Sequence, residues 1–197
     1  MRAHPLVRNA GLLWAAATQS PFLEGLADGS LAEDAFRRWL AQDYRFAKDL
    51  TAFQVLVVAK SPRDCHRLLI EGLAALDREL EWFEGHAARL RVDLGVERHP
   101  ACRRYCDFLL RCAYSEPCPV LLAMLFGVEA SYLAAWSALE PAGAYAEFIQ
   151  RWSGAGFAAY VAALGELAER YPHERAQDGF NEVLGFERDF WKMAWEG

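Results

Sequence analysis

The sequence has few basic residues, and they form no cluster. Lys and Arg together number 21 against 27 Asp and Glu, which gives a formal net charge of −6 at pH 7. Domains that bind nucleic acid carry a basic stripe that neutralises phosphates. We therefore expect no nucleic-acid partner.

Long apolar runs, strand-like alternation and linkers are also lacking. No uninterrupted stretch of about 18 apolar residues is present, so the sequence predicts no membrane span. There is no internal repeat, no low-complexity segment and no Pro/Gly-rich stretch long enough to divide domains. A chain of 197 residues suits one large domain. We expect a single domain over residues 1–197.

Cysteine and histidine are sparse, and their spacing does not indicate a metal site. Di-iron helical bundles need Glu-x-x-His motifs, and none of the five histidines follows an inward-facing Glu by three residues. The five cysteines include no CxxC pair. We expect a reduced cytoplasmic protein with buried thiols, no metal and no cofactor. The cysteines are Cys65, Cys102, Cys106, Cys112 and Cys118.

Apolar residues recur at helical spacing in long segments, separated by short Pro- or Gly-containing breakers. This pattern predicts an all-α protein, a compact bundle of seven or more helices. We expect helices near residues 5–18, 21–28, 32–59, 63–92, 100–114, 119–138, 142–152, 155–170 and 174–195.

Three carboxylates, Asp43, Glu129 and Glu187, lie in the middle of otherwise apolar helix faces. An isolated ionised carboxylate is very costly in an apolar interior, so each must be paired, hydrogen-bonded or in contact with a cavity. Their expected neighbours on the same faces include Trp39, Phe46 and Leu50 for Asp43, Leu125, Tyr132 and Trp136 for Glu129, and Val183, Phe190 and Trp191 for Glu187.

A single buried acid usually pairs with a buried Arg, Lys or Tyr and only fixes how helices pack. Three acids on three helices favour another interpretation, because few cations occupy these faces. Lys48, Lys60 and Lys192 fall beside the apolar stripes. Carboxylates that share a cavity also shift one another's pKa values, as acid/base pairs require. The pattern therefore indicates a polar pocket with aromatic walls.

Four stretches of this sequence resemble the TenA family, also called thiaminase II. They are SPFLEGLADGSLAEDAFRRWLAQDYRF at residues 20–46, the region of Tyr105, LFGVEASYLAAW at residues 125–136, and FERDFWKMAW at residues 186–195. The resemblance extends over essentially the whole chain. The resemblance implies a helical bundle similar to heme oxygenase, without heme, assembled as a homodimer or homotetramer.

The resemblance also implies hydrolysis in thiamin salvage, which releases 4-amino-5-hydroxymethyl-2-methylpyrimidine from thiamin or its degradation products. By matching positions, Asp43 would hold the aminopyrimidine through its exocyclic amine and a ring nitrogen. Glu187 would be the acid/base group at the opposite edge of the ring. Tyr105 and Tyr132 match tyrosines that line the pocket. A carboxylate and aromatic rings suit such a flat, amidine-like ligand.

The sequence departs from the thiamin-cleaving members at three positions. Val128 stands where those members have a cysteine nucleophile, and Glu129 follows it. Phe46 and Trp152 replace two family tyrosines. These changes resemble the cysteine-lacking, glutamate-bearing branch of the family.

We therefore expect a hydrolase of aminomethyl- or N-formylaminomethyl-pyrimidines. Glu129 and Glu187 would divide the tasks of activating water and protonating the leaving group, and the sequence does not assign these tasks individually. Two alternatives stay open: a non-catalytic pyrimidine-binding protein, and a metal-dependent oxygenase on the same fold.

Overall fold

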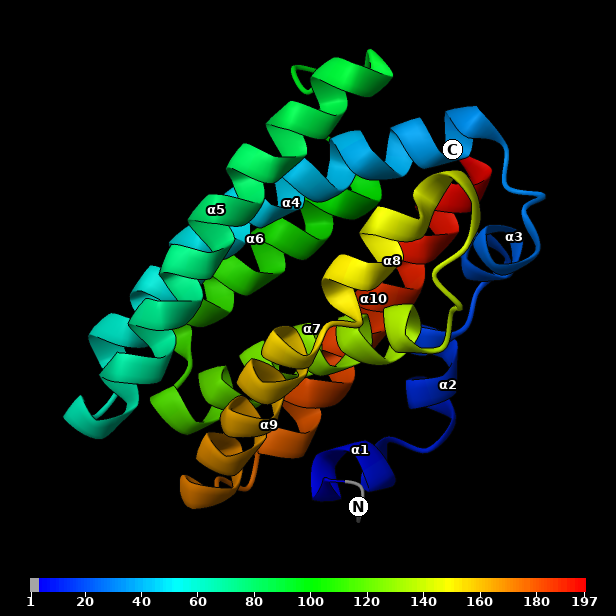
Figure 1. Ribbon diagram of the computed structural model, residues 1–197. Helices are drawn as coiled ribbons and strands as arrows, with labels where there is room; N and C mark the ends of the chain where they lie inside the picture. The colour runs from blue at the N-terminus through cyan, green and yellow to red at the C-terminus, as the bar shows by residue number, and fades with distance from the viewer. Residues whose placement is uncertain (1–3) are drawn as a thin grey trace. The chain divides into compact units, whose positions relative to one another are not determined.

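The computed structural model describes residues 4–197, and every regular element in that range is helical. The predicted all-α fold class is therefore confirmed. Two 3-10 turns, Arg63–Cys65 and Gly143–Tyr145, precede α5 and α8. The helices in chain order are α1 (Pro5–Ala10), α2 (Leu12–Thr18), α3 (Pro21–Asp28), α4 (Glu33–Lys60), α5 (His66–Leu90), α6 (Pro100–Ser115), α7 (Cys118–Ser137), α8 (Ala146–Trp152), α9 (Ala155–Arg170) and α10 (Ala176–Glu196) (Figure 1).

The prediction of one continuous helix over residues 5–18 is wrong. Gly11 separates α1 from α2 with a φ of 55°, a value that residues with a side chain rarely adopt. The apolar periodicity continues across this break, so it did not reveal the break. The other predicted helices are present within a few residues of their expected ends.

The chain divides into two compact units, each built from two or more separate stretches of sequence. Unit 1 comprises the chain up to Leu31 together with Pro119–Lys192, and unit 2 comprises Ala32–Cys118 together with Met193–Gly197. The expectation of a single domain over residues 1–197 stays a prediction.

Unit 2 is built on α4, α5 and α6. α4 and α5 run in opposite directions, as two hydrogen bonds show. Gln54, in the second half of α4, donates from Nε2 to the Leu69 carbonyl near the start of α5, at 2.9 Å. Tyr44, nearer the start of α4, donates to the Glu84 carboxylate near the end of α5, at 2.8 Å.

α6 runs parallel to α4 on the same unit. Near the start of α6, the Cys102 thiol donates to the Gln42 carbonyl at 3.6 Å. Near its end, Lys60 Nζ donates to the Tyr114 carbonyl at 2.9 Å. Along the chain, the antiparallel α5 connects the end of α4 back to the start of α6. Figure 1 shows the three helices lying side by side. The largest buried side chains of this unit are Phe36, Trp39, Phe53, Phe83 and Tyr105.

Unit 1 is organised around α7 and α10, which also run parallel. Toward the start of both helices, Gly179 lies so close to α7 that a Cβ there would meet Val120 at 3.0 Å. Further along both, the rings of Tyr132 and Trp191 stack with centroids 6.0 Å apart and planes at 14°. Helices α2 and α3 are too short to be stable alone. They are held by aromatic packing on α10.

α7 bears on the prediction that the sequence contains no membrane span. Among the described helices, α7 is long and apolar enough to cross a membrane by length and composition, with a mean hydropathy of 1.7. Glu129 and Ser131 interrupt the apolar run but do not lower the average enough. Within the protein, 67% of this stretch is buried. That degree of burial is what the core helix of a folded domain shows.

Arg38 on α4 caps the end of α10. Its Nε donates to the Met193 carbonyl at 3.2 Å, and its Nη2 donates to the carbonyls of Ala194 and Trp195 at 2.9 and 3.0 Å. The last carbonyls of a helix have no partner within the helix and carry a partial negative charge. One guanidinium therefore satisfies three such groups.

Replacing Arg38 by Ala should lower the free energy of unfolding by about 2 kcal/mol, because three charge-assisted hydrogen bonds to helix carbonyls are lost. Urea unfolding followed by circular dichroism measures this change. Arg37→Ala is the matched control, since Arg37 pairs with exposed Glu33 one turn away, and the loss of that exposed pair should cost about 0.5 kcal/mol or less. Equal losses in the two variants would contradict the capping role.

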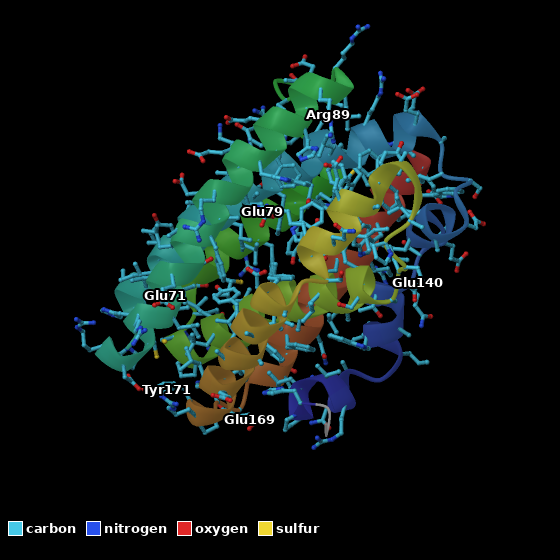
Figure 2. All side chains as sticks on the ribbon, in the orientation of Figure 1. Glu71, Glu79, Arg89, Glu140, Glu169 and Tyr171 are labelled. Carbon is cyan, nitrogen blue, oxygen red and sulfur yellow. The ribbon has the colours of Figure 1, made fainter. Side chains whose placement is uncertain are left out.

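His4 fastens the start of α1 to α9. Its Nδ1 accepts the Leu6 amide at 3.2 Å, and its Nε2 donates to the Gly165 carbonyl at 3.2 Å. The ring packs on Phe126 with centroids 4.4 Å apart. Burial lowers the pKa of His4, and the carboxylate of Glu169 at 3.5 Å opposes this as a smaller effect. Figure 2 shows Glu169 near the end of α9.

The lowered pKa of His4 predicts a pH-dependent stability. The folded state favours the neutral ring, so its contribution is complete above about pH 6.5 and is lost as the pH falls toward the folded pKa. Between about pH 7.5 and about pH 5, urea unfolding should show a larger loss of stability for the wild type than for His4→Gln. The amide keeps a donor and an acceptor but does not titrate. Parallel pH profiles would refute this account.

Candidate functional site

The predicted ring anchor, Asp43, lies in the middle of α4 and is only 6% exposed. Phe46 follows it by three residues, so both side chains leave the same face of the helix. Phe46 packs against Tyr105 of α6, with ring centroids 4.7 Å apart and planes at 31°. Tyr105 is itself fully buried. Unit 2 thus places a buried carboxylate one helical turn from a pair of packed aromatic rings.

Unit 1 carries the other two carboxylates. Glu187 on α10 is 5% exposed, and Glu129 on α7 is half-buried. A Cβ at Gly127 would lie 3.2 Å from Val183, so these two positions face each other. Because the helices are parallel, one turn further along both lie Glu187 on α10 and Ser131 on α7. Glu129 is two residues before Ser131, so the two acids lie within about one turn of each other along neighbouring helices.

Four aromatic side chains pack together one turn beyond these acids. Tyr132 stacks on Trp191 and meets Trp152 edge-on, with centroids 5.4 Å apart and planes at 83°. Trp136 contacts both Trp152, at 4.9 Å, and Trp191, at 6.2 Å. The three tryptophans are buried, whereas Tyr132 is half-buried. Aromatic side chains from three different helices thus pack together in unit 1, and the predicted pocket with aromatic walls stays a prediction.

Contacts with α2 and α3 fix the orientation of Trp191 in this aromatic cluster. Trp191 Nε1 donates to the Ala17 carbonyl at 3.0 Å, and its ring packs on Phe22 with centroids 5.5 Å apart. Sequence reasoning missed the role of Ala17, because an alanine carbonyl carries no signal of its own. The indole N–H of Trp191 is the only hint, since a buried indole usually finds an acceptor.

The seven predicted site residues fall into two clusters. Asp43, Phe46 and Tyr105 lie in unit 2. The cluster of unit 1 contains Glu129, Tyr132, Trp152 and Glu187. A single pocket that contains all seven stays a prediction.

The histidines of the protein take part in local hydrogen bonds rather than in a metal site. Within residues 4–197, no group of three or more His, Cys, Asp or Glu side chains is arranged to hold a metal ion. His4 and His99 each accept a backbone amide at the start of a helix, and His173 accepts the Arg175 amide in the same way. The metal-dependent oxygenase has no support from these positions.

Four of the five cysteines are buried, and Cys118 is half-buried. A hydrogen bond with Cys102, burial and the nearby Asp49 carboxylate all raise the pKa of the Cys106 thiol. Burial likewise raises the pKa of Cys118, which begins α7 about three helical turns before Glu129. At the position of the expected nucleophile stands Val128, buried at 3% exposure. A raised pKa keeps a thiol protonated, and the thiolate is the nucleophilic form.

Comparison with known proteins identifies the family. Residues 7–197 match the TENA/THI-4/PQQC family. The chain belongs to that family. A protein from Glycine max named "Probable bifunctional TENA-E protein" is 27% identical over 93% of this chain and 88% of its own length.

Solved structures of TenA-like proteins superpose closely. A TenA homologue from Pyrococcus furiosus is 31% identical with a TM-score of 0.89, covering 96% of this chain and 98% of its own. A domain from Shewanella denitrificans with a heme oxygenase-like fold is 14% identical with a TM-score of 0.76, covering 97% and 90%. The resemblance to the TenA family and the predicted heme oxygenase-like fold are both confirmed.

The state of the thiols in this TenA-family protein predicts its response to alkylation. With iodoacetamide at about pH 7.5, we expect modification of the folded protein to be confined to half-buried Cys118 and slow even there. In guanidinium chloride all five cysteines should react. Peptide mass spectrometry distinguishes the sites. Rapid modification of Cys102 or Cys106 in the folded protein would show that a reactive thiolate exists.

Proposed function

We propose that this protein is a hydrolase in thiamin salvage that converts an aminomethyl- or N-formylaminomethyl-4-amino-2-methylpyrimidine to the hydroxymethyl form. The observation that carries the proposal is the pair Val128 and Glu129. A buried valine stands at the nucleophile position, and a half-buried glutamate stands beside it on α7. Membership in the TENA/THI-4/PQQC family supports the thiamin-related role.

In the proposed reaction, water replaces nitrogen at the exocyclic methylene carbon. The carbon–nitrogen bond breaks and a carbon–oxygen bond forms. The aminomethyl substrate releases ammonia, and the N-formyl substrate releases formamide. One carboxylate takes a proton from water, and one carboxylic acid gives a proton to the leaving nitrogen. Two acids with different protonation states are therefore required.

The different environments of the two acids of unit 1 support this assignment. Glu187 is almost fully buried, whereas Glu129 is half-buried on the neighbouring helix. Carboxyl groups in different surroundings separate their pKa values, which is how a general acid and a general base coexist at one pH. Tyr132 and the tryptophans around it would provide flat contacts for the ring.

The role proposed for Asp43 is to anchor the pyrimidine. A carboxylate can accept one hydrogen bond from the exocyclic amine and one from a protonated ring nitrogen, a bidentate arrangement of high specificity. Phe46 and Tyr105, packed together one turn away, would flank the ring.

The test is to incubate the purified protein with the aminomethyl-pyrimidine, its N-formyl form and thiamin, and to follow the hydroxymethyl product by chromatography. We expect turnover of at least one of the first two and little of thiamin. Glu129→Gln and Glu187→Gln should each lower kcat by about 100-fold or more. Asp43→Asn should weaken binding as well as turnover. Glu182→Gln, at an exposed position of α10, is the matched control and should leave kcat unchanged.

Three outcomes would contradict the proposal. Binding of pyrimidines without turnover, unchanged by Glu129→Gln, would indicate a non-catalytic binding protein. Stoichiometric iron in elemental analysis would favour the oxygenase. Failure to bind or convert any of the three compounds would remove the pyrimidine site altogether.

A further inference from the structure

Gln42, the residue before the proposed ring anchor Asp43, is 5% exposed, and its side-chain amide and backbone carbonyl form hydrogen bonds around the start of α6. Its Nε2 donates to the Glu97 carbonyl at 2.9 Å, and its Oε1 accepts the His99 amide at 2.8 Å. Its backbone carbonyl accepts the Cys102 thiol at 3.6 Å. One side chain on α4 thus holds the N-terminal end of α6.

A second contact fastens the same segment to α4. Arg98 donates from Nη2 to the Asp49 carboxylate at 2.8 Å. Asp49 follows Gln42 by seven residues, so both lie on one face of α4, two turns apart. Phe46 lies between them on that face, where it packs against Tyr105. The start of α6 is therefore held on either side of the aromatic pair.

We propose that Gln42 is a positioning residue for the pyrimidine anchor: it sets the height of α6 along α4, and with it the placement of Tyr105 beside Phe46 and Asp43. The inference rests on the proposed function, because it assumes that these three side chains contact the ring. A shift of one helical turn would move Tyr105 by about 5.4 Å. Displacements of about 1 Å already impair an arranged site.

Gln54 provides a matched comparison on the same helix. It is buried at 1% exposure, and its Nε2 donates to the Leu69 carbonyl of α5 at 2.9 Å. It lies about three turns from Asp43 and bonds to α5. Loss of either amide removes buried hydrogen bonds and lowers stability. Only the loss of Gln42 should displace the residues around the anchor.

The experiment compares Gln42→Met with Gln54→Met, both close in volume to glutamine. Steady-state kinetics with the aminomethyl-pyrimidine are measured at a temperature where both variants are folded. We expect the KM of Gln42→Met to rise about tenfold with kcat within about twofold of wild type, since an anchor that holds the ring throughout the reaction affects mainly binding. Gln54→Met should lower the unfolding temperature and leave KM unchanged.

Gln42→Glu supplies a second test that does not depend on folding of the methionine variant. A protonated glutamic acid has the donor and acceptor of glutamine, whereas the carboxylate has no donor for the Glu97 carbonyl. The ratio of its KM to that of the wild type should therefore be near one at low pH. It should rise as the introduced acid ionises. A purely structural role would leave this ratio flat.

The outcomes separate the two proposals. If the wild type converts the pyrimidine but Gln42→Met has an unchanged KM, or the KM ratio of Gln42→Glu does not vary with pH, the positioning role is wrong and the proposed function stands. If Gln54→Met raises KM as much as Gln42→Met, the effect is general destabilisation, and the positioning role is again wrong. If the wild type neither binds nor converts the pyrimidine, both proposals fall.

Discussion

The cost of burying a carboxylate is the constraint on which this structure depends. An acid that loses its hydration without gaining partners destabilises a protein by several kcal/mol, more than one hydrogen bond contributes. Asp43 and Glu187 are each about 95% buried. The helices that carry them must therefore hold the surroundings of each acid constant. On α4, Gln42 next to Asp43 bonds to the Glu97 carbonyl, and on α10 the indole of Trp191, one turn from Glu187, binds the Ala17 carbonyl.

Much of this arrangement could be predicted from the sequence because helices are local. Apolar residues at helical spacing, ended by Pro or Gly, located nearly every helix within a few residues. The same periodicity exposed the acids, since a carboxylate inside an apolar stripe conflicts with burial unless it has partners. Asp43 and Glu187 are indeed buried. The contact of Phe46 with Tyr105 joins two helices. The resemblance to the TenA family indicated both residues as site residues but did not predict that they touch.

The features that sequence reasoning missed depend on distant parts of the chain. Gln42 is a polar residue of a kind that usually lies at the surface. Its hydrogen bond to the His99 amide joins it to a segment far along the sequence. Gln54 is joined to α5 in the same way. α7 shows a different limit: it is apolar on almost every side and buried on most of them. Periodicity assigned Glu129 to an apolar face of α7, yet this helix has no distinct polar face. The half-burial of Glu129 follows from its neighbours and could not follow from the pattern.

The adjacency of Val128 and Glu129 has a mechanistic consequence under the proposed function. Successive residues on a helix point about 100° apart, so a glutamate at 129 does not project along the direction of a cysteine at 128. It approaches from another side, and its carboxylate lies further from the backbone than a thiol would. A carboxylate in this position leaves room for a water molecule between it and the substrate, and that water can act as the nucleophile. General-base activation of that water needs only hydrogen-bond reach, whereas covalent attack needs the nucleophile in contact with the reacting carbon. The substitution therefore favours direct hydrolysis over a covalent intermediate.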